Sequence, residues 1–296
     1  MKLTRSNFGE LLTPVHKKVF FNEYDGLEKQ YPELAKVYDM TKKDDTFPHM
    51  GALGMWDENT EGNTINETEF NQGPTATLTA KRFDQGYSVT WELVRDDLYN
   101  VMKGLGKNGN AAGLGYGLNT RVEVDVANVY NNGFTNTGYD GVALFSDTHP
   151  LADSSSFGDN LLTGALNPEN LKAGKSLMRA QVNQAGLKIQ ARAKDLIVGP
   201  DLEFTALEIT QSDKQAYEQS NTKNVIEGIT PKVFDYINGS KWFLRDPRFD
   251  NVMMGWRDKP IFDSYQMPKT VDWFYYGYSR YAVGYVHWAG LVGSQG

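Results

Sequence analysis

The chain has 296 residues, of which 40% are hydrophobic and 23% are charged, a composition that excludes a disordered protein. Its formal net charge is −7 and it contains no block of Lys and Arg, which argues against a protein that reads DNA or RNA sequence. The absence of cysteine excludes disulfides, thiolate metal sites and a cysteine nucleophile.

The first part of the chain, residues 1–45, is expected to be helical. Asp25 and Glu28 have the spacing of a capping box, and Pro32 predicts a break or a fresh helix start. The N-terminus has no apolar core of signal-peptide length, and no window holds the roughly 20 apolar residues that span a bilayer. We therefore expect no membrane partner and a protein kept in a cytoplasm. Apolar residues at helical spacing predict one buried face: Leu27, Tyr31, Leu34 and Tyr38.

The next part, residues 46–80, carries acidic residues and no Lys or Arg. Residues 74–83 alternate between apolar and polar side chains, which predicts a strand, and the NQGP run at 71–74 predicts a turn before it. With the TINETEF run at 64–70 as the second strand, the simplest interpretation is a long acidic β-hairpin. Composition leaves two arrangements open: packing on its own domain, which is the simpler, and projection onto a neighbouring subunit.

Helical periodicity follows this hairpin. A short strand is predicted at 87–91, and apolar stripes predict helices at 91–101 and 114–129. The glycines from Gly104 to Gly117 predict a loop or bend between the helices, because each glycine inside a helix costs about 1 kcal/mol relative to alanine. The GLGYG run within this stretch lacks the GxGxxG spacing of a dinucleotide site, so a bend is also its better explanation.

The run GVALFSDTHP, residues 141–150, contains the residue types of a nucleophilic hydrolase. We expect instead a strand over residues 142–145 that ends in a turn capped by its own polar side chains, with Pro150 stopping the pairing. Ser146 lacks the GxSxG elbow, and it stands too close to His149 in sequence for the usual triad, whose members come from separate loops. A hydrolase that uses Ser146 or a carboxylate pair remains the alternative function, although no spacing singles out such a pair.

The AGKS run at 173–176 resembles the end of a phosphate loop. Glu169 stands where that motif needs glycine, so a helix over residues 168–184 is the better prediction. A strand at 196–200 leads into another helix.

The aromatic end, residues 271–292, is strand-like, and the mixed order of helices and strands favours the α+β class. Its aromatic residues leave a carbohydrate-binding module as a third possibility. We predict no catalytic, cofactor-binding or metal-binding residue, because no zinc motif is present and the histidines lie far apart in sequence: His16, His49, His149 and His287.

Several runs follow one another in an order and spacing that are together distinctive: EGNTINETEFNQG at 61–73, SVTWELVRDDLY at 88–99, VANVYNNGF at 126–134, DGVALFSDTHPL at 140–151, LIVGPDLEFTALEI at 196–209 and KWFLRD at 241–246. They resemble the extended loop, the spine helix and the later segments of the major capsid proteins of tailed bacteriophages with the Hong Kong 97-like fold. Within that group, the resemblance is to the Mu-type major head subunits.

The resemblance implies an α+β capsid fold in four parts. Residues 1–45 would form the N-terminal arm and residues 46–90 the extended β-hairpin loop. Residues 91–164 and 267–296 would form the peripheral domain with the spine helix, and residues 165–266 the axial domain. The implied function is that of a structural subunit, not an enzyme, which self-assembles into the icosahedral head shell around a double-stranded DNA genome.

The implied partners are identical subunits in hexamers and pentamers, with portal, scaffolding and cement proteins. The DNA would be enclosed without sequence-specific binding, and no cofactor is implied. The protein would be assembled in the host bacterial cytoplasm and would reside in the virion capsid. Some relatives crosslink through a lysine of the extended loop, which residues 46–80 lack.

The resemblance and the composition together predict which residues of the loop contact a neighbouring subunit: Trp56, Glu61, Glu67, Glu69 and Phe70. The acidic loop requires basic partners, for which Lys172, Lys175 and Arg179 are candidates at helical spacing.

Overall fold

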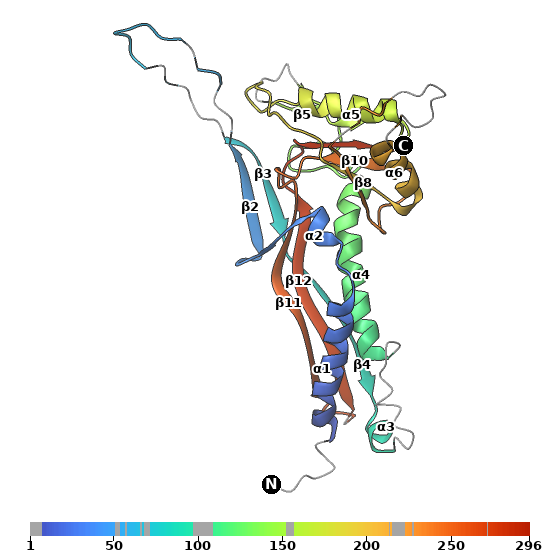
Figure 1. Cartoon of the computed structure of the whole chain (residues 1–296). Coiled ribbons are helices and arrows are strands. Elements are labelled where there is room, and N and C mark those ends of the chain that lie inside the picture. The colour runs from blue at the N-terminus through green and yellow to red at the C-terminus, as the bar shows by residue number, and fades with distance from the viewer. Residues whose placement is uncertain are drawn as a thin grey trace.

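The structure is a computed structural model that describes residues 8–50, 54–56, 58–65, 67, 72–96, 109–151, 157–212, 214, 223–226, 228–270 and 272–296. Figure 1 shows an elongated molecule. Its lower part, here called the body, packs long helices on a sheet of long strands. Above it lies the crown, formed by residues 157–251 and 286–296, and a β-hairpin projects from the junction of the two. The α+β class is confirmed.

The body sheet has the strand order β1-β11-β12-β4, with β11 and β12 antiparallel along most of their length. Residues of β12 alternate between buried and half-buried positions, because one face of the sheet lies against the helices. The alternating aromatic residues are therefore core on one face, as with Tyr275 and Tyr281. The strand bounds are β1 (Lys36–Asp39), β11 (Val252–Gln266), β12 (Trp273–Tyr285) and β4 (Lys81–Val89).

Two long helices, α1 (Phe8–Gly26) and α4 (Asn110–Asn131), lie side by side along this sheet (Figure 1). The predicted bend at residues 113–117 is wrong, since α4 runs through them. Gly115 has a packing reason, because a Cβ there would come within 2.6 Å of the Phe20 carbonyl oxygen. The stability gained from close packing of α1 on α4 thus exceeds the free-energy cost of a glycine inside the helix.

The start of the chain differs from its prediction in two respects. Residues 36–39 form strand β1, and β2 (Asp44–Met50) begins at Asp44, so the predicted helical face does not extend to Tyr38 and the described residues up to 45 are not helical throughout. Asp25 lies in the last turn of α1 and pairs with Lys29 at 3.2 Å, so the capping box predicted there is wrong. The fresh start near Pro32 is confirmed, because α2 (Tyr31–Leu34) has this proline in its first turn, where it needs no N–H donor. The short helix α3 (Trp91–Asp96) follows β4, and the first glycines of the stretch after it, Gly104 and Gly106, lie outside the described residues.

The hairpin consists of β2 (Asp44–Met50) and β3 (Gln72–Thr79), which pair antiparallel. The predicted strand at 64–70 is wrong for its described residues, which belong to no strand, and part of the predicted turn at 71–74 belongs to β3. Ala76 and Leu78 pack in a cluster with body residues such as Met253, and this burial selects β2 as the partner of β3.

The crown is built on the sheet β7-β13-β10-β8-β9, covered by α5 and α6. Its core contains Trp242, Leu244 and Met178, each fully buried. The helix predicted from residue 168 and the strand predicted near residue 196 are confirmed. The element bounds are β7 (Leu161–Leu162), β13 (Leu291–Ser294), β10 (Trp242–Arg245), β8 (Asp195–Val198), β9 (Thr230–Val233), the 3-10 turn η2 (Pro200–Leu202), α5 (Pro168–Ala180) and α6 (Glu203–Gln211).

Between body and crown, residues 142–145 form no strand, which contradicts the prediction. Strand β5 (His149–Pro150) instead pairs with β6 (Phe157–Gly158), so Pro150 takes part in the pairing that it was expected to end. Phe145 and Leu144 are buried in the main core, which holds this segment without strand pairing. Among the described residues, no helix has the length and apolarity that crossing a membrane requires.

Candidate assembly interface

The hairpin tip carries large apolar side chains that contact almost nothing. Trp56 is 94% exposed, Ile65 is 89% exposed and Met55 is 79% exposed. Figure 1 shows this tip well away from the body. Such exposure is unusual for a folded protein and is typical of surfaces that a partner covers. Of the loop residues predicted to contact a neighbour, Trp56 is at this tip, whereas Phe70 lies outside the described residues.

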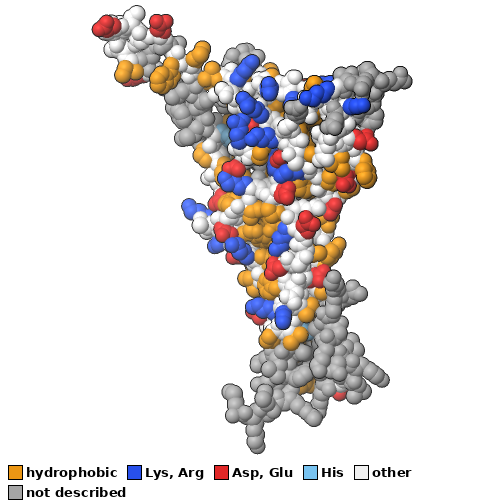
Figure 2. Space-filling view, in the orientation of Figure 1, with side chains coloured by type: hydrophobic (Ala, Val, Ile, Leu, Met, Phe, Trp, Pro, Cys, Tyr) orange, Lys and Arg blue, Asp and Glu red, His pale blue; other side chains and the backbone are white. Residues whose placement is uncertain are grey.

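The same tip is acidic. We call Glu58, Glu61 and Glu67 the tip acids; all are exposed, and none forms an ion pair with any residue that the structure describes. Figure 2 shows acidic side chains at the far end of the hairpin, next to hydrophobic ones. Of the predicted acidic contact residues, Glu61 and Glu67 are thus brought to the tip, while Glu69 lies outside the described residues.

One stretch of the crown, residues 165–194, is basic. In Figure 2, Lys and Arg side chains gather over the upper part of the molecule. Within the described chain, five cations between residues 165 and 194 form no ion pair, and the only acidic residue in that stretch is Glu169. The sequence pattern identified only the two of these five that lie on α5, because the three cations that follow the helix have no helical spacing. We call the five the crown cations: Lys172, Arg179, Lys188, Arg192 and Lys194.

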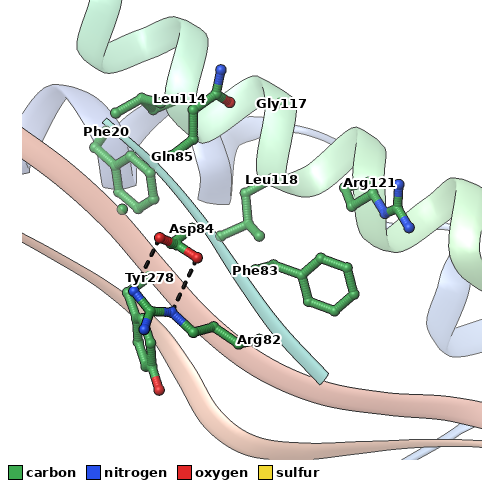
Figure 3. Close-up of a pocket in the computed structure, with 11 residues that line it drawn as sticks. Phe20, Arg82, Phe83, Asp84, Gln85, Leu114, Gly117, Leu118, Arg121 and Tyr278 are labelled. Atoms are coloured by element: carbon green, nitrogen blue, oxygen red, sulfur yellow. Dashed lines mark hydrogen bonds and ion pairs between the residues drawn. The ribbon is translucent and has the colours of Figure 1, made fainter. Parts of the chain in front are cut away.

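Several cations of the body are paired with carboxylates. Arg82 donates two hydrogen bonds of 3.0 Å to the Asp84 carboxylate, and Arg121 donates one of 2.9 Å to Asp125. These pairs rim a cavity of about 380 Å³ between α1, α4 and β4, shown in Figure 3. Its inner wall is apolar and includes Phe20. The cavity therefore has no unpaired charged side chain among its lining residues and no arrangement of a nucleophile and a base.

The candidate hydrolase residues do not form a catalytic site. The Ser146 hydroxyl lies 2.9 Å from that of Thr148 and accepts a 3.2 Å hydrogen bond from its backbone N–H. His149 Nδ1 lies 2.7 Å from Asp140 Oδ2, and its Nε2 lies 3.2 Å from the Leu144 carbonyl oxygen. Both ring nitrogens therefore have partners other than Ser146, and no triad exists. The expected structural role of this run is confirmed, although its partners differ.

The phosphate-loop resemblance at residues 173–176 is also structural. Gly174 lies inside α5, where a Cβ would come within 2.8 Å of Leu244. Among the residues that the structure describes, no group of His, Asp and Glu side chains could hold a metal ion.

Sequence reasoning missed one cluster entirely. Three of the four histidines, which are far apart in sequence, meet where the hairpin joins the molecule: His49 of β2, His149 of β5 and His287 after β12. Burial lowers the pKa of His49, and a hydrogen bond from its ring to the Val286 backbone carbonyl and the charge of Asp140 oppose this. Burial, followed by the charges of His49 and His149, lowers the pKa of His287 to about 4. No sequence spacing could have predicted this meeting.

Comparisons with known proteins agree on one kind of molecule. The family model described as "Phage capsid protein" matches residues 74–294. A search of curated proteins finds no match. Among solved structures, the chain resembles one of Microbacterium phage Oxtober96, with a TM-score of 0.57, 9% identity, and coverage of 90% of this chain and 91% of that one.

Two further structures share the fold. The procapsid of bacteriophage JBD30 matches with a TM-score of 0.51 and 16% identity over 96% of this chain and 74% of that chain. The virus-like particle from Pyrococcus furiosus matches with a TM-score of 0.54 and 8% identity over 96% of this chain and 99% of that one. The fold is thus Hong Kong 97-like. The chain belongs to the phage capsid protein family: it is a major capsid protein, a non-enzymatic subunit of the icosahedral head shell of the virion, built from identical copies.

Proposed function

We propose that the hairpin is the clasp by which each subunit holds its neighbour in the shell. In rings of five or six copies, head-to-tail contacts close on themselves, so each subunit would give one hairpin and receive another. These rings are the pentamers and hexamers that the resemblance implies.

The observation that carries this proposal is the exposure of Trp56 and Ile65 at the end of a projecting hairpin. Burying one such side chain stabilises a contact by about 2 kcal/mol, a gain that the isolated subunit does not realise. Aromatic anchors at the centre of an interface commonly supply much of its binding energy. Glu61 lies between Trp56 and Ile65 in the sequence, and Glu67 follows Ile65. Glu69 and Phe70, which were also predicted to contact a neighbour, remain part of the proposal.

Charge favours the crown of the neighbouring copy as the receiving surface. The tip acids and the crown cations are unpaired within the described chain and opposite in sign, so a contact between them would neutralise both. Lys172 and Arg179 lie on one side of α5, next to its buried face, and Lys188 and Lys194 extend the basic surface beyond the helix. Lys175, also on α5, is part of the same proposal.

The division into arm, extended loop, peripheral domain and axial domain is proposed with three changes. Residues 252–266, first assigned to the axial domain, form β11 and pair with β12, so we place them in the peripheral domain. Residues 81–89, first assigned to the extended loop, form β4 and also pair with β12, so they join the peripheral domain, whereas β13 pairs with β10 and joins the axial domain. The runs at 88–99 and 140–151 support the finer proposal that the chain is a Mu-type head subunit. Portal, scaffolding and cement proteins, and enclosed DNA bound without sequence specificity, complete the proposed partners.

A charge exchange tests the clasp. We expect the triple reversal of the tip acids (Glu58→Lys, Glu61→Lys, Glu67→Lys) to prevent closed shells, because like charges would face each other. Reversal of three crown cations should do the same: Lys172→Glu, Arg179→Glu and Lys194→Glu. Combining both sets restores opposite charges at the contact and should restore shells in electron micrographs.

The matched control is Lys81→Glu, which reverses an exposed cation of the body that lies outside the crown and should leave assembly unchanged. A combined variant that assembles no better than either triple reversal would show that tip and crown do not meet. Normal shells from Trp56→Ser with Ile65→Ser would remove the clasp role altogether.

A further inference from the structure

We propose that His49, His149 and His287, together with Asp140, form an acid-sensitive latch that holds the hairpin against the molecule near neutral pH and releases it in acid. The inference concerns the movement of the hairpin within one subunit, so it does not depend on where the tip docks.

His49 connects the hairpin to the latch. It lies next to the end of β2, its ring stacks on Tyr139 at 4.3 Å between centroids, and it meets the His287 ring edge-on at 5.1 Å. Its Nε2 is buried and has no hydrogen-bond partner among the described residues. A neutral ring tolerates this because an unprotonated nitrogen needs no acceptor, whereas protonation would place an unpaired N–H and a charge there.

His287 is held neutral by its hydrogen bonding. Its Nδ1 accepts a 2.7 Å hydrogen bond from the backbone N–H of Ala289, so this nitrogen must carry a lone pair. A second proton on the ring would break that bond at the point where the chain turns into the crown. The backbone carbonyl of His287 also accepts a hydrogen bond from Asn251, which fixes the same turn.

His149 differs because both of its nitrogens face acceptors. Nδ1 lies 2.7 Å from the Asp140 carboxylate, and Nε2 lies 3.2 Å from both the Leu144 carbonyl oxygen and the Asn160 side-chain oxygen. His149 is therefore the histidine of the latch that contacts the Asp140 carboxylate directly. The cluster thus holds one carboxylate for three imidazoles.

Of the carboxylates that the structure describes, none other than Asp140 acts on His49 or His287 from the elements packed around them. The cavity beside His49 and His287, about 110 Å³, is lined from the 182–189 segment and Phe249 by side chains without charge. The segment before β5 contributes Tyr139 and Asp140, and β12 contributes Tyr285. The charge of Asp140 affects the pKa of His49. The charges of His49, His149 and Asp140 affect the pKa of His287.

The consequence is a hairpin held at two places with different responses to pH. Its base, where Leu78 packs in the apolar cluster with Met253, contains no titratable group that acid would charge. At His49, acid creates positive charges on two rings 5.1 Å apart, while Asp140, the carboxylate of the cluster, is already paired with His149. A histidine whose folded pKa is lowered loses its folded contacts as pH falls from the ordinary value towards the lowered one. The hairpin should therefore pivot on its base in that interval.

Spin labels can measure this movement, because the chain has no cysteine of its own. Thr64→Cys on the hairpin and Ser176→Cys on α5 would carry the labels, in full-length chain diluted with unlabelled chain. Dipolar spectroscopy should show the label distance changing and broadening as pH falls from about 7 to about 4.5, the interval set by the histidine pKa values. The variant His49→Phe with His287→Asn keeps a stacking ring and an acceptor but cannot be charged, and its distance should not change.

The control is His16→Asn, which removes the remaining histidine. His16 is buried in the body, stacked on Tyr275, and burial lowers its pKa to about 4 as well. This variant should keep the wild-type response. The proposal is overturned if the wild-type distance is the same at both pH values, if His16→Asn rather than the latch variant abolishes the change, or if circular dichroism shows the whole chain unfolding over the same interval.

Discussion

Glu123 provides a direct test of how burial shapes the stability of this subunit. The residue lies in the middle of α4, is only 4% exposed, and its Oε1 accepts a 2.8 Å hydrogen bond from the backbone N–H of Gln30. This hydrogen bond connects α4 to the start of α2. Burial raises the pKa of Glu123 to about 7, although hydrogen bonds from the Gln30 and Tyr31 backbone partly oppose the shift.

The size and sign of the effect follow from that pKa. The folded value of about 7 against the ordinary 4.5 corresponds to about 3 kcal/mol at most, since one unit is about 1.4 kcal/mol. Because the folded state binds the proton more tightly than the unfolded state, this stability is fully present below the ordinary pKa. It is lost as pH rises through the folded pKa, above which the buried carboxylate is charged.

The substitution Glu123→Gln keeps an oxygen that can accept from Gln30 and removes the charge. We expect the variant to be more stable than wild type by up to about 3 kcal/mol above about pH 8, and similar to it near pH 5. Urea unfolding of the unassembled subunit, followed by tryptophan fluorescence at a series of pH values, measures the difference. An exposed carboxylate on α3 serves as the control through Glu92→Gln, which should leave the pH profile unchanged.

Two results would refute this reasoning. If Glu123→Gln lost as much stability between about pH 5 and about pH 8 as wild type does, another group would be responsible for the loss. If it were less stable than wild type at every pH, the ionised carboxylate would be a favourable partner of the α2 backbone, and burial would not be the dominant effect.

Four further substitutions test the packing of the subunit and the absence of a catalytic role for Ser146. Leu244→Ala, at a fully buried position of the crown core, should destabilise the subunit by about 2–5 kcal/mol in urea unfolding. Gly199→Ala should cost at least about 2 kcal/mol, because the new Cβ would lie 2.2 Å from the Ile237 carbonyl oxygen, whereas Gly26→Ala, with open space around it, should be tolerated. Ser146→Ala should cost only about 1 kcal/mol through the lost hydrogen bond to Thr148 and should leave shell formation in electron micrographs unchanged; loss of a measurable hydrolytic activity in this variant would contradict that expectation.

Sequence patterns correctly predicted the elements whose formation depends on residues close to one another in the chain. The helix at residue 168 has proline in its first turn and an Asn167 side chain that accepts the Asn170 N–H, so its start was readable in the sequence. The alternation of residues 75–79 identified β3, and the alternation of the aromatic end identified β12. The partner of β3 was predicted wrongly because Pro48 and several polar residues give β2 a low strand propensity. Burial of apolar side chains at the hairpin base compensates for this low propensity and stabilises the pairing of β2 with β3.

Composition and motif order by themselves determined the class of molecule, the acidic loop and the absence of a catalytic motif, because each depends on which residues are present and how they are spaced along the chain. Only the tertiary structure decided that α4 continues through its glycines, that unpaired cations gather on the crown opposite an acidic tip, and that three histidines separated by about a hundred residues or more meet at the hairpin. Contacts of this kind depend on how distant segments bury one another, and that burial is not encoded in any local repeat of the sequence.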